Sequence, residues 1–255
     1  MKRWGPAIAP TLFIGALLAF WEACCRLLAI PIFFLPPPSE IAVALVQNAP
    51  ELFASAWLTL TVALTAFVIV SLLANAAALA AAASPLVEAS LRPIAVTLQV
   101  TPIFAIAPMV AVWAGVDHPD RAVIALACVA AFFPIYSGSV AGLSSADPAL
   151  ERLFDLYGAS LWQRLVRLRA PSAVPQALEG HKVGLGLALI GAVVGELAAG
   201  SGSTTGLAWR ILEASHHLEM AKSFAALAAL GLLAAALQLA FLLLERRALE
   251  WWRGA

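Results

Sequence analysis

Long uncharged runs separated by short charged segments dominate this chain. No Asp, Glu, Lys or Arg occurs in residues 52–87, 93–116, 122–146 or 223–244. About 20 consecutive apolar residues are enough for a helix to cross the hydrocarbon layer of a bilayer. With two further apolar runs, the pattern predicts an all-α polytopic membrane protein, a single transmembrane domain over residues 1–255. The six expected transmembrane helices lie at about 7–29, 58–83, 95–115, 122–143, 183–199 and 223–244.

The overall composition supports a lipid-facing surface. Hydrophobic residues make up 62% of the chain and charged residues 12%, whereas soluble domains carry roughly 25% charged residues. Helices satisfy their own backbone hydrogen bonds, which lipid cannot do. The formal net charge is zero, and no nucleic-acid partner is expected.

The distribution of cations predicts the orientation in the membrane. Of 15 Lys and Arg residues, Arg26 lies within the first expected span. If the N-terminus is inside, three lie outside, namely Arg121, Arg210 and Lys222, and the other 11 lie inside. Because short cytoplasmic segments carry an excess of cations, we expect both termini in the cytoplasm.

Three prolines punctuate the uncharged run that contains the third expected span. Pro93, Pro102 and Pro108 would bend that helix and free backbone carbonyls, a feature tolerated where a helix lines protein or a water-filled cavity. Gln99 and Thr101 are the polar residues of this span. Two interpretations stay open: the span lines a pathway, or the prolines are simple packing kinks.

A few polar residues lie within the apolar runs. Glu22 and Arg26 are four residues apart and can form an ion pair on one helix face. Asn75 is expected to make a hydrogen bond between helices rather than to touch a substrate. Glu196 ends or interrupts the fifth span. Because carboxylates within a membrane are costly and often functional, Glu196 is a candidate pathway residue or an interfacial one. Residues 197–222 read as a flexible loop.

Small residues recur at spacings of three and four along the fifth span. A stripe of this kind lets helix backbones approach closely in lipid. The pattern predicts a tightly packed helix, with a dimer face as one alternative for its partner. Its members are Gly180, Gly184, Ala188, Gly191 and Gly195.

The longest charged passage lies between the fourth and fifth spans, at about 146–182. Apolar residues recur in it at helical spacing with charges opposite. Gly158 interrupts the pattern, and Pro171 and Pro175 are expected to end it. The predicted element is a helix, a glycine bend, a second helix and a proline stop. It is either an ordinary cytoplasmic loop or a docking element for a soluble partner.

Motifs of catalysis are missing from the sequence. It contains no P-loop, nucleophile elbow or zinc-protease motif. Cys24, Cys25 and Cys128 have no disulfide or metal spacing, and the adjacent His216 and His217 alone are poor evidence for a metal. We therefore expect no catalytic residue, no metal and no cofactor, and the chain is not expected to be an enzyme.

The charged loop resembles the cytoplasmic EAA loop of permease subunits of bacterial ABC importers. That pattern is E-A-A, three residues, Gly, nine residues and I-x-L-P. Gly158 matches its glycine, Leu168 its isoleucine and Pro171 its proline, whereas Ala170 replaces the leucine. The E-A-A triplet falls on residues 152–154, which read Arg-Leu-Phe, and is not kept.

Other stretches are similar to permeases of the nitrate, sulfonate and taurine type. Their order and spacing cover nearly the whole chain from about residue 30, although the usual G-L-G after the fifth span is Gly206-Leu207-Ala208. These stretches are FFLPPPSEI (33–41), TPIFAIAPMVAVWAG (101–115), FFPIY (132–136), YGAS (157–160), ALEGHKVGLGLALIGAVVGEL (177–197) and ERRALEWW at the end.

The resemblance implies a type I ABC importer permease fold and a multi-pass subunit of the bacterial inner membrane. Its expected partners are a cytoplasmic ABC ATPase dimer, which hydrolyses ATP, a periplasmic or lipid-anchored solute-binding protein, and a second permease copy. The solute would be small, nitrate-, sulfonate- or taurine-like or heteroaromatic. The 151–171 loop would couple the permease to the ATPase through Tyr157, Gly158, Ala159, Ser160, Leu168 and Pro171. The candidate pathway residues are Gln99, Thr101, Pro102, Pro108 and Glu196.

One alternative belongs to another class of transporter. A stand-alone secondary transporter would use an ion gradient coupled through intramembrane carboxylates such as Glu22 or Glu196. Most of the expected spans carry no carboxylate in their middle, which disfavours this alternative.

Overall fold

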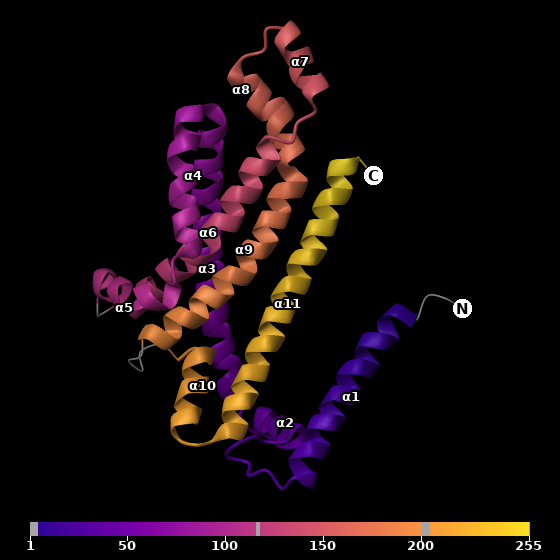
Figure 1. Cartoon of the computed structure of the whole chain (residues 1–255), viewed down its shortest axis with the longest axis vertical. Coiled ribbons are helices and arrows are strands. Elements are labelled where there is room, and N and C mark those ends of the chain that lie inside the picture. Colours follow the sequence, from indigo (N-terminus) through magenta and orange to yellow (C-terminus); the bar gives the residue numbers. More distant parts are fainter. Residues whose placement is uncertain (1–4, 116–117, 200–204, 255) are drawn as a thin grey trace. The chain divides into compact units, whose positions relative to one another are not determined.

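A computed structural model describes residues 5–115, 118–199 and 205–254 of the chain (Figure 1). Lys2, Arg3, Asp117 and residues 200–204 of the expected loop lie outside the described residues. Every regular element in the described ranges is a helix. The helices are α1 (Gly5–Leu27), α2 (Pro38–Gln47), α3 (Ala49–Ala83), α4 (Pro85–Val100), α5 (Ile103–Ala114), α6 (Pro119–Leu143), α7 (Pro148–Leu156), α8 (Leu161–Arg164), the π-helix η1 (Leu165–Arg169), α9 (Ala170–Ala199), α10 (Leu207–His216) and α11 (Met220–Arg253).

These helices fall into two compact units. The first comprises Met1–Trp57 and Thr205–Gly231, and the second comprises Leu58–Thr204 and Leu232–Ala255. Two of the boundaries lie within α3 and α11, so both helices contribute to both units.

Four helices among the described residues are long and apolar enough to cross a membrane. A fifth span results if the bent pair α4 and α5 is counted as one. The first predicted span, 7–29, coincides with α1, whose side chains are described only from Thr11 onward, and six spans therefore stay a prediction. The four long helices are Ala49–Ala83, Pro119–Leu143, Leu161–Ala198 and Met220–Trp252.

The region predicted as one span at 95–115 is a broken helix pair. Helix α4 begins at Pro85, and α5 turns away from it by 105°. The break lies at Thr101, which takes the extended conformation that is favoured before a proline, and Pro102 precedes the first residue of α5. Pro93 and Pro108 instead lie inside their helices. Of the three prolines, Pro102 is thus the one at which the chain breaks.

The predicted flexible loop 197–222 contains a helix. Helix α10 begins after Gly206 and places Leu207, Ala208 and Ala214 in the interior. Its Arg210 forms ion pairs with Glu213 at 2.8 Å and with Glu51 of α3 at 2.7 Å. The helix is amphipathic, and burial of its apolar side stabilises it. The neighbouring Gly and Ser residues alone had suggested a loop.

The second unit is built on the packing of α6 against α9. A Cβ atom built at Gly191 would lie 2.6 Å from the Cα of Ala127, and one at Gly195 would lie 2.8 Å from the Cα of Val123. Gly180 is equally close to the Pro134 carbonyl, at 2.6 Å. The stripe of small residues therefore faces α6 of the same chain. The tight packing that we predicted is present, and the dimer face considered for it is wrong for these residues.

The expected proline stop is wrong. Helices α8, η1 and α9 follow one another without a break, and Leu161–Ala198 forms a single long helix. A π turn over Leu165–Arg169 directly precedes Pro171, and Ala170 donates to the Leu165 carbonyl five residues back. This wider turn lets the helix pass Pro171, whose ring would otherwise clash with the carbonyl four residues before it. The charged loop is therefore physically continuous with the fifth span.

Candidate functional site

The charged loop forms a helical hairpin around Gly158. Helix α7 begins at Pro148, where the Asp147 side chain accepts a hydrogen bond of 2.7 Å from the Ala149 amide. The helix ends at Leu156, Tyr157 is its C-cap residue, and Gly158 follows with a φ of +62°. A glycine takes this left-handed conformation without the Cβ penalty of other residues. Gly158 thus reverses the chain at the position that the sequence predicted.

A capping box starts the second helix of the hairpin. The Ser160 hydroxyl accepts from the Gln163 amide at 3.3 Å, and the Gln163 side chain accepts from the Ser160 amide at 2.8 Å. This reciprocal pair satisfies two amides that the first turn leaves free. Ser160 was predicted as a coupling residue, and the structure gives it a local role in fixing where α8 begins.

Ion pairs hold the two arms of the hairpin together. Arg169 of η1 binds Glu151 of α7 at 2.7 Å, and Arg164 of α8 pairs with Asp155 of α7. Arg164 also donates to the Ala159 carbonyl at 3.3 Å. Because each pair joins residues of different arms, the hairpin is a defined element rather than an irregular loop.

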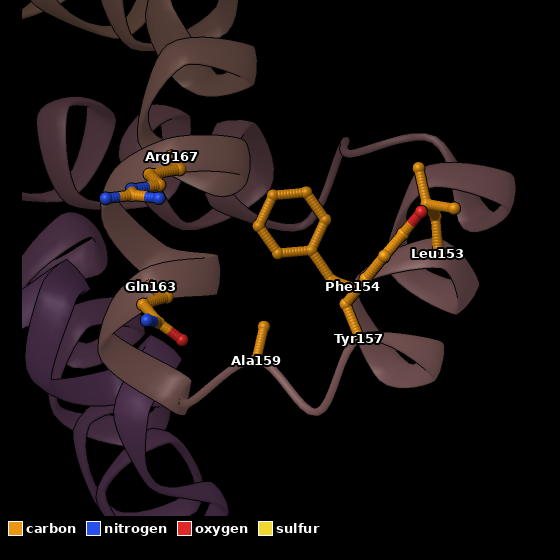
Figure 2. Close-up of a pocket in the computed structure, with 6 residues that line it drawn as sticks. All are labelled: Leu153, Phe154, Tyr157, Ala159, Gln163 and Arg167. Carbon is orange, nitrogen blue, oxygen red and sulfur yellow. The ribbon is translucent and has the colours of Figure 1, made fainter.

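The tip of the hairpin exposes large apolar side chains. Tyr157 and Leu156 are 82% and 84% exposed, and Leu161 and Trp162 are 69% and 71% exposed. Between the arms lies a hollow of about 300 Å³. Figure 2 shows the side chains that line it, which are Leu153, Phe154, Tyr157, Ala159, Gln163 and Arg167. An exposed apolar tip of this kind is typical of an interaction surface.

The remaining coupling candidates lie away from the tip. Leu168 is buried, with 5% of its surface exposed. Pro171 is exposed, and its carbonyl accepts a hydrogen bond of 2.6 Å from the Trp252 indole. Sequence reasoning missed this contact, which joins residues 81 positions apart.

The pathway candidates are divided between two regions. Gln99, Thr101, Pro102 and Pro108 lie on the bent pair α4 and α5, where Thr101 is half-buried and the other three are exposed. The Thr101 hydroxyl donates to the carbonyl of residue 97. Glu196 instead lies in α9 with 2% of its surface exposed.

Glu196 and Thr59 form a buried polar contact between α9 and α3. The Thr59 hydroxyl donates to the Glu196 carboxylate at 2.7 Å, and Thr59 is completely buried. A carboxylate in such a place needs hydrogen-bond donors to offset its lost hydration. Glu196 is thus a packed interior group in this conformation.

Asn75 makes the interhelical hydrogen bonds that the sequence predicted. Its side-chain oxygen accepts from Ser139 of α6 at 2.7 Å, and its nitrogen lies 3.0 Å from His181 Nε2 of α9. The partners could not be read from the sequence, because Ser139 is 64 residues away and His181 is 106 residues away.

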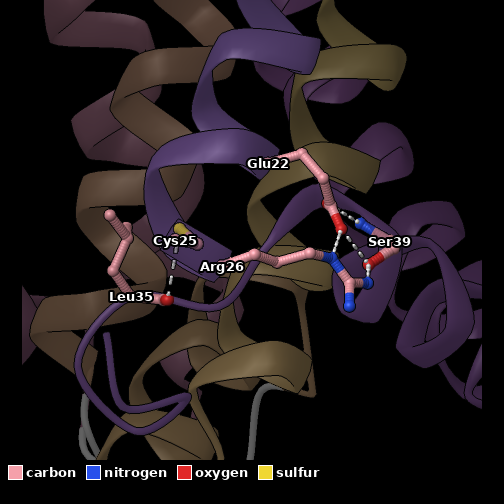
Figure 3. A network of polar contacts seen from close by, with 5 residues as sticks. All are labelled: Glu22, Cys25, Arg26, Leu35 and Ser39. Atoms are coloured by element: carbon pink, nitrogen blue, oxygen red, sulfur yellow. Dashed lines mark hydrogen bonds and ion pairs between the residues drawn. The ribbon is translucent and has the colours of Figure 1, made fainter. Parts of the chain in front are cut away.

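Glu22 and Arg26 form the predicted ion pair within the first unit (Figure 3). The Glu22 carboxylate also accepts from the amide of Ser39 at 3.0 Å and from its hydroxyl at 2.9 Å. Arg26 donates to the same hydroxyl at 3.2 Å. The pair thus ties α1 to the start of α2, which indicates a structural role. Among the residues that the structure describes, no group of His, Cys, Asp and Glu could hold a metal ion.

Comparisons with known proteins agree on one family. The sequence profile of the family described as "binding-protein-dependent transport system inner membrane component" matches residues 74–250. The chain is 32% identical to the riboflavin transport system permease protein of Chloroflexus aurantiacus, over 96% of this chain and 91% of that protein. It is 31% identical to the formylaminopyrimidine transport permease protein of Halalkalibacterium halodurans, over 77% and 78%. It is 30% identical to the taurine transport system permease protein of Escherichia coli, over 98% and 92%.

Proposed function

The chain belongs to the family of inner membrane components of binding-protein-dependent transport systems, and we propose that its 151–171 hairpin couples it to a separate ATPase. Members of this family are permease subunits of ABC importers. They are not themselves enzymes, because the ATPase is a separate subunit. The chain is accordingly a multi-pass membrane permease component, and the proposal concerns how it is driven and what it carries.

The observation that carries the proposal is the exposed apolar tip of the hairpin. Tyr157 and Leu156 lie outside the predicted membrane spans, where lipid would not cover them. More than four fifths of the surface of each is exposed. Covering two such side chains would remove a large apolar area from water. A groove on a cytoplasmic ATPase is the partner that the EAA-type spacing of Gly158, Leu168 and Pro171 favours.

The hairpin can act as a lever because it is continuous with a span. Since α8, η1 and α9 form one helix, a push on the tip would move α9 rather than only a loop. Helix α9 packs against α6 without room for a Cβ at Gly191, so the two helices would move together. The ATPase would thus shift the permease between its inward-open and outward-open states, as nucleotide and loaded binding protein favour different states.

The pathway would form between this chain and a second permease copy. The broken pair α4 and α5 exposes Gln99, Pro102 and Pro108, and Thr101 lies at its break. Exposed polar backbone is tolerated in a membrane only beside protein or water, so we propose that these four residues line the pathway. Glu196 would contribute if the pathway opens beside α9. A periplasmic or lipid-anchored binding protein would deliver the solute, and both termini would lie in the cytoplasm.

The solute is proposed to be a small sulfonate or heteroaromatic compound. The names of the relatives support this part of the proposal, since they are described as transport proteins for taurine, riboflavin and a formylaminopyrimidine. Both kinds of compound are small and polar. The binding protein would make the finer choice between them.

Purification in mild detergent with mass spectrometry of the associated proteins tests the coupling. We expect a P-loop ATPase at about one copy per permease. Leu156→Asp at the hairpin tip should release the ATPase, whereas Leu218→Asp should retain it. Leu218 is a matched control because it is 66% exposed and lies on the side predicted to be periplasmic. A wild-type chain recovered without an ATPase, and moving solute in vesicles under an ion gradient, would refute the proposal in favour of a secondary transporter.

A further inference from the structure

Two prolines four residues apart leave a backbone carbonyl without its usual donor. In an α-helix the carbonyl of residue 171 accepts from the amide of residue 175. Residue 175 is a proline inside α9 and has no N–H to donate. The sequence therefore creates a free acceptor at Pro171, at the point where the coupling hairpin joins the fifth span.

Trp252 supplies the missing donor. Its indole Nε1 donates to the Pro171 carbonyl at 2.6 Å, from near the end of α11. The neighbouring Trp251 is 81% exposed, whereas Trp252 is 40% exposed. An indole N–H is a donor only, so it complements a carbonyl that lacks one. The fit explains why the two adjacent tryptophans differ in their surroundings.

Further long side chains join α11 to α9. Lys182 of α9 binds Glu245 of α11 at 3.2 Å, and Glu245 is buried although it is charged. Gln238 of α11 donates to the Lys182 carbonyl at 3.3 Å. The Trp252 contact is thus the last of a series of links that ends at the base of the hairpin.

We propose that Trp252 is a positioning residue for the coupling hairpin: its indole replaces the hydrogen bond that Pro175 removes and fixes the first turns of α9. The proposal rests on the coupling role of the 151–171 hairpin for its consequence, but not for the contact itself. Without Trp252, the turns between the two prolines open, and motion at the tip is absorbed there instead of moving the span. The end of α11 thereby sets how stiffly the ATPase is linked to the pathway.

A double-mutant cycle measured by amide hydrogen exchange tests this assignment on the full-length purified protein. Trp252→Phe keeps an aromatic ring and removes the donor. We expect exchange in residues 165–180 to become about fivefold faster, the factor expected for the net loss of one hydrogen bond. Trp251→Phe, the matched control, should leave exchange there unchanged.

Restoring the amide at residue 175 provides the decisive arm of the cycle. Pro175→Ala gives the helix its own donor for the Pro171 carbonyl, so adding Trp252→Phe to this variant should change exchange less than twofold. If Trp252→Phe speeds exchange equally in the wild-type and the Pro175→Ala proteins, the proposal is overturned, because Trp252 would then act through packing alone. A Trp252→Phe variant that behaves like Trp251→Phe would also overturn it.

The hydrolysis of MgATP by the co-purified complex measures the consequence. Trp252→Phe should change the rate, and Pro175→Ala should bring it back toward the wild-type value. If the exchange cycle behaves as expected while the wild-type chain brings no ATPase with it, the coupling role fails and the Trp252 contact stands. If the ATPase is present and the cycle shows no coupling between residues 175 and 252, the positioning role is refuted and the coupling role stands.

Discussion

Asn75 of α3 donates a side-chain hydrogen bond to His181 of α9, with Asn75 Nδ2 and His181 Nε2 3.0 Å apart. The direction follows from the other ring nitrogen. His181 Nδ1 lies 2.7 Å from the Ala177 carbonyl, which can only accept, so Nδ1 carries the proton and Nε2 accepts. Ser139 donates to Asn75 Oδ1 at 2.7 Å. One directed chain of hydrogen bonds thus links α6, α3 and α9.

Asn75→Leu should destabilise the protein by roughly 1–3 kcal/mol, because it leaves the Ser139 hydroxyl and His181 Nε2 without this shared partner. The change is measurable as a lower midpoint of thermal unfolding in detergent. Thr65→Val is the control, since the Thr65 hydroxyl bonds only one carbonyl of its own helix in the contacts described. An equal midpoint for the two variants would show that the chain of hydrogen bonds does not stabilise the fold.

Gly191→Ala should lower stability by about 1–3 kcal/mol, the usual cost of forcing extra volume into a packed interior. Its Cβ would meet the Ala127 backbone at 2.6 Å, and backbone atoms cannot move aside as a flexible side chain can. Gly231→Ala is the control, because nothing lies within 4 Å of a Cβ at that position of α11. It should be neutral or stabilising by up to about 1 kcal/mol through helix propensity. Thermal unfolding of both variants in one detergent tests the difference.

What the sequence could predict was set by the distance over which each signal acts. Uncharged runs, the bend at Gly158 and the small-residue stripe are local patterns, and each was readable from neighbouring residues. The small-residue stripe predicted close packing but not its partner, because the match of Gly191 with Ala127 depends on how α6 and α9 pair in space. For the same reason Asn75 was predicted to bond between helices while Ser139 and His181 went unnamed.

Prolines were the least reliable local signal. Pro102 breaks the third span, whereas Pro171 and Pro175 lie inside α9. The helix continues past Pro171 because a π turn precedes that residue. It continues past Pro175 because the Trp252 indole donates to the Pro171 carbonyl, which has lost its usual donor at residue 175. That donor comes from the far end of the chain, and no window of sequence around the prolines contains it.

Glu196→Gln should leave the fold nearly unchanged, because an amide oxygen can still accept from the Thr59 hydroxyl. Thr59→Val removes that donor from a buried carboxylate and should lower the unfolding midpoint by the equivalent of about 1–3 kcal/mol. Thr61→Val is the matched control, as its hydroxyl bonds a carbonyl of its own helix. If Glu196→Gln changes the kinetics of solute uptake while keeping the wild-type unfolding midpoint, the charge of Glu196 acts in the pathway. Unchanged uptake restricts Glu196 to packing.

Gly158 should tolerate substitution according to backbone conformation rather than size. Nothing lies within 4 Å of a Cβ at this position, but its φ of +62° disfavours side chains other than those of Asn and Asp. Gly158→Asn should therefore keep MgATP hydrolysis by the purified complex within about twofold of wild type. Gly158→Val, at a cost of about 1–2 kcal/mol or more in this conformation, should reduce it about tenfold.

The bulky variant Gly158→Trp should insert and fold but fail to couple hydrolysis to uptake, because the bend at the hairpin tip is lost. Equal hydrolysis in the Asn and Val variants would show that the left-handed turn is not needed for coupling. Full uptake by Gly158→Trp would count against a coupling role of the hairpin, since the bend at Gly158 would then not be needed. The three substitutions together separate the conformation of the turn from the space around it.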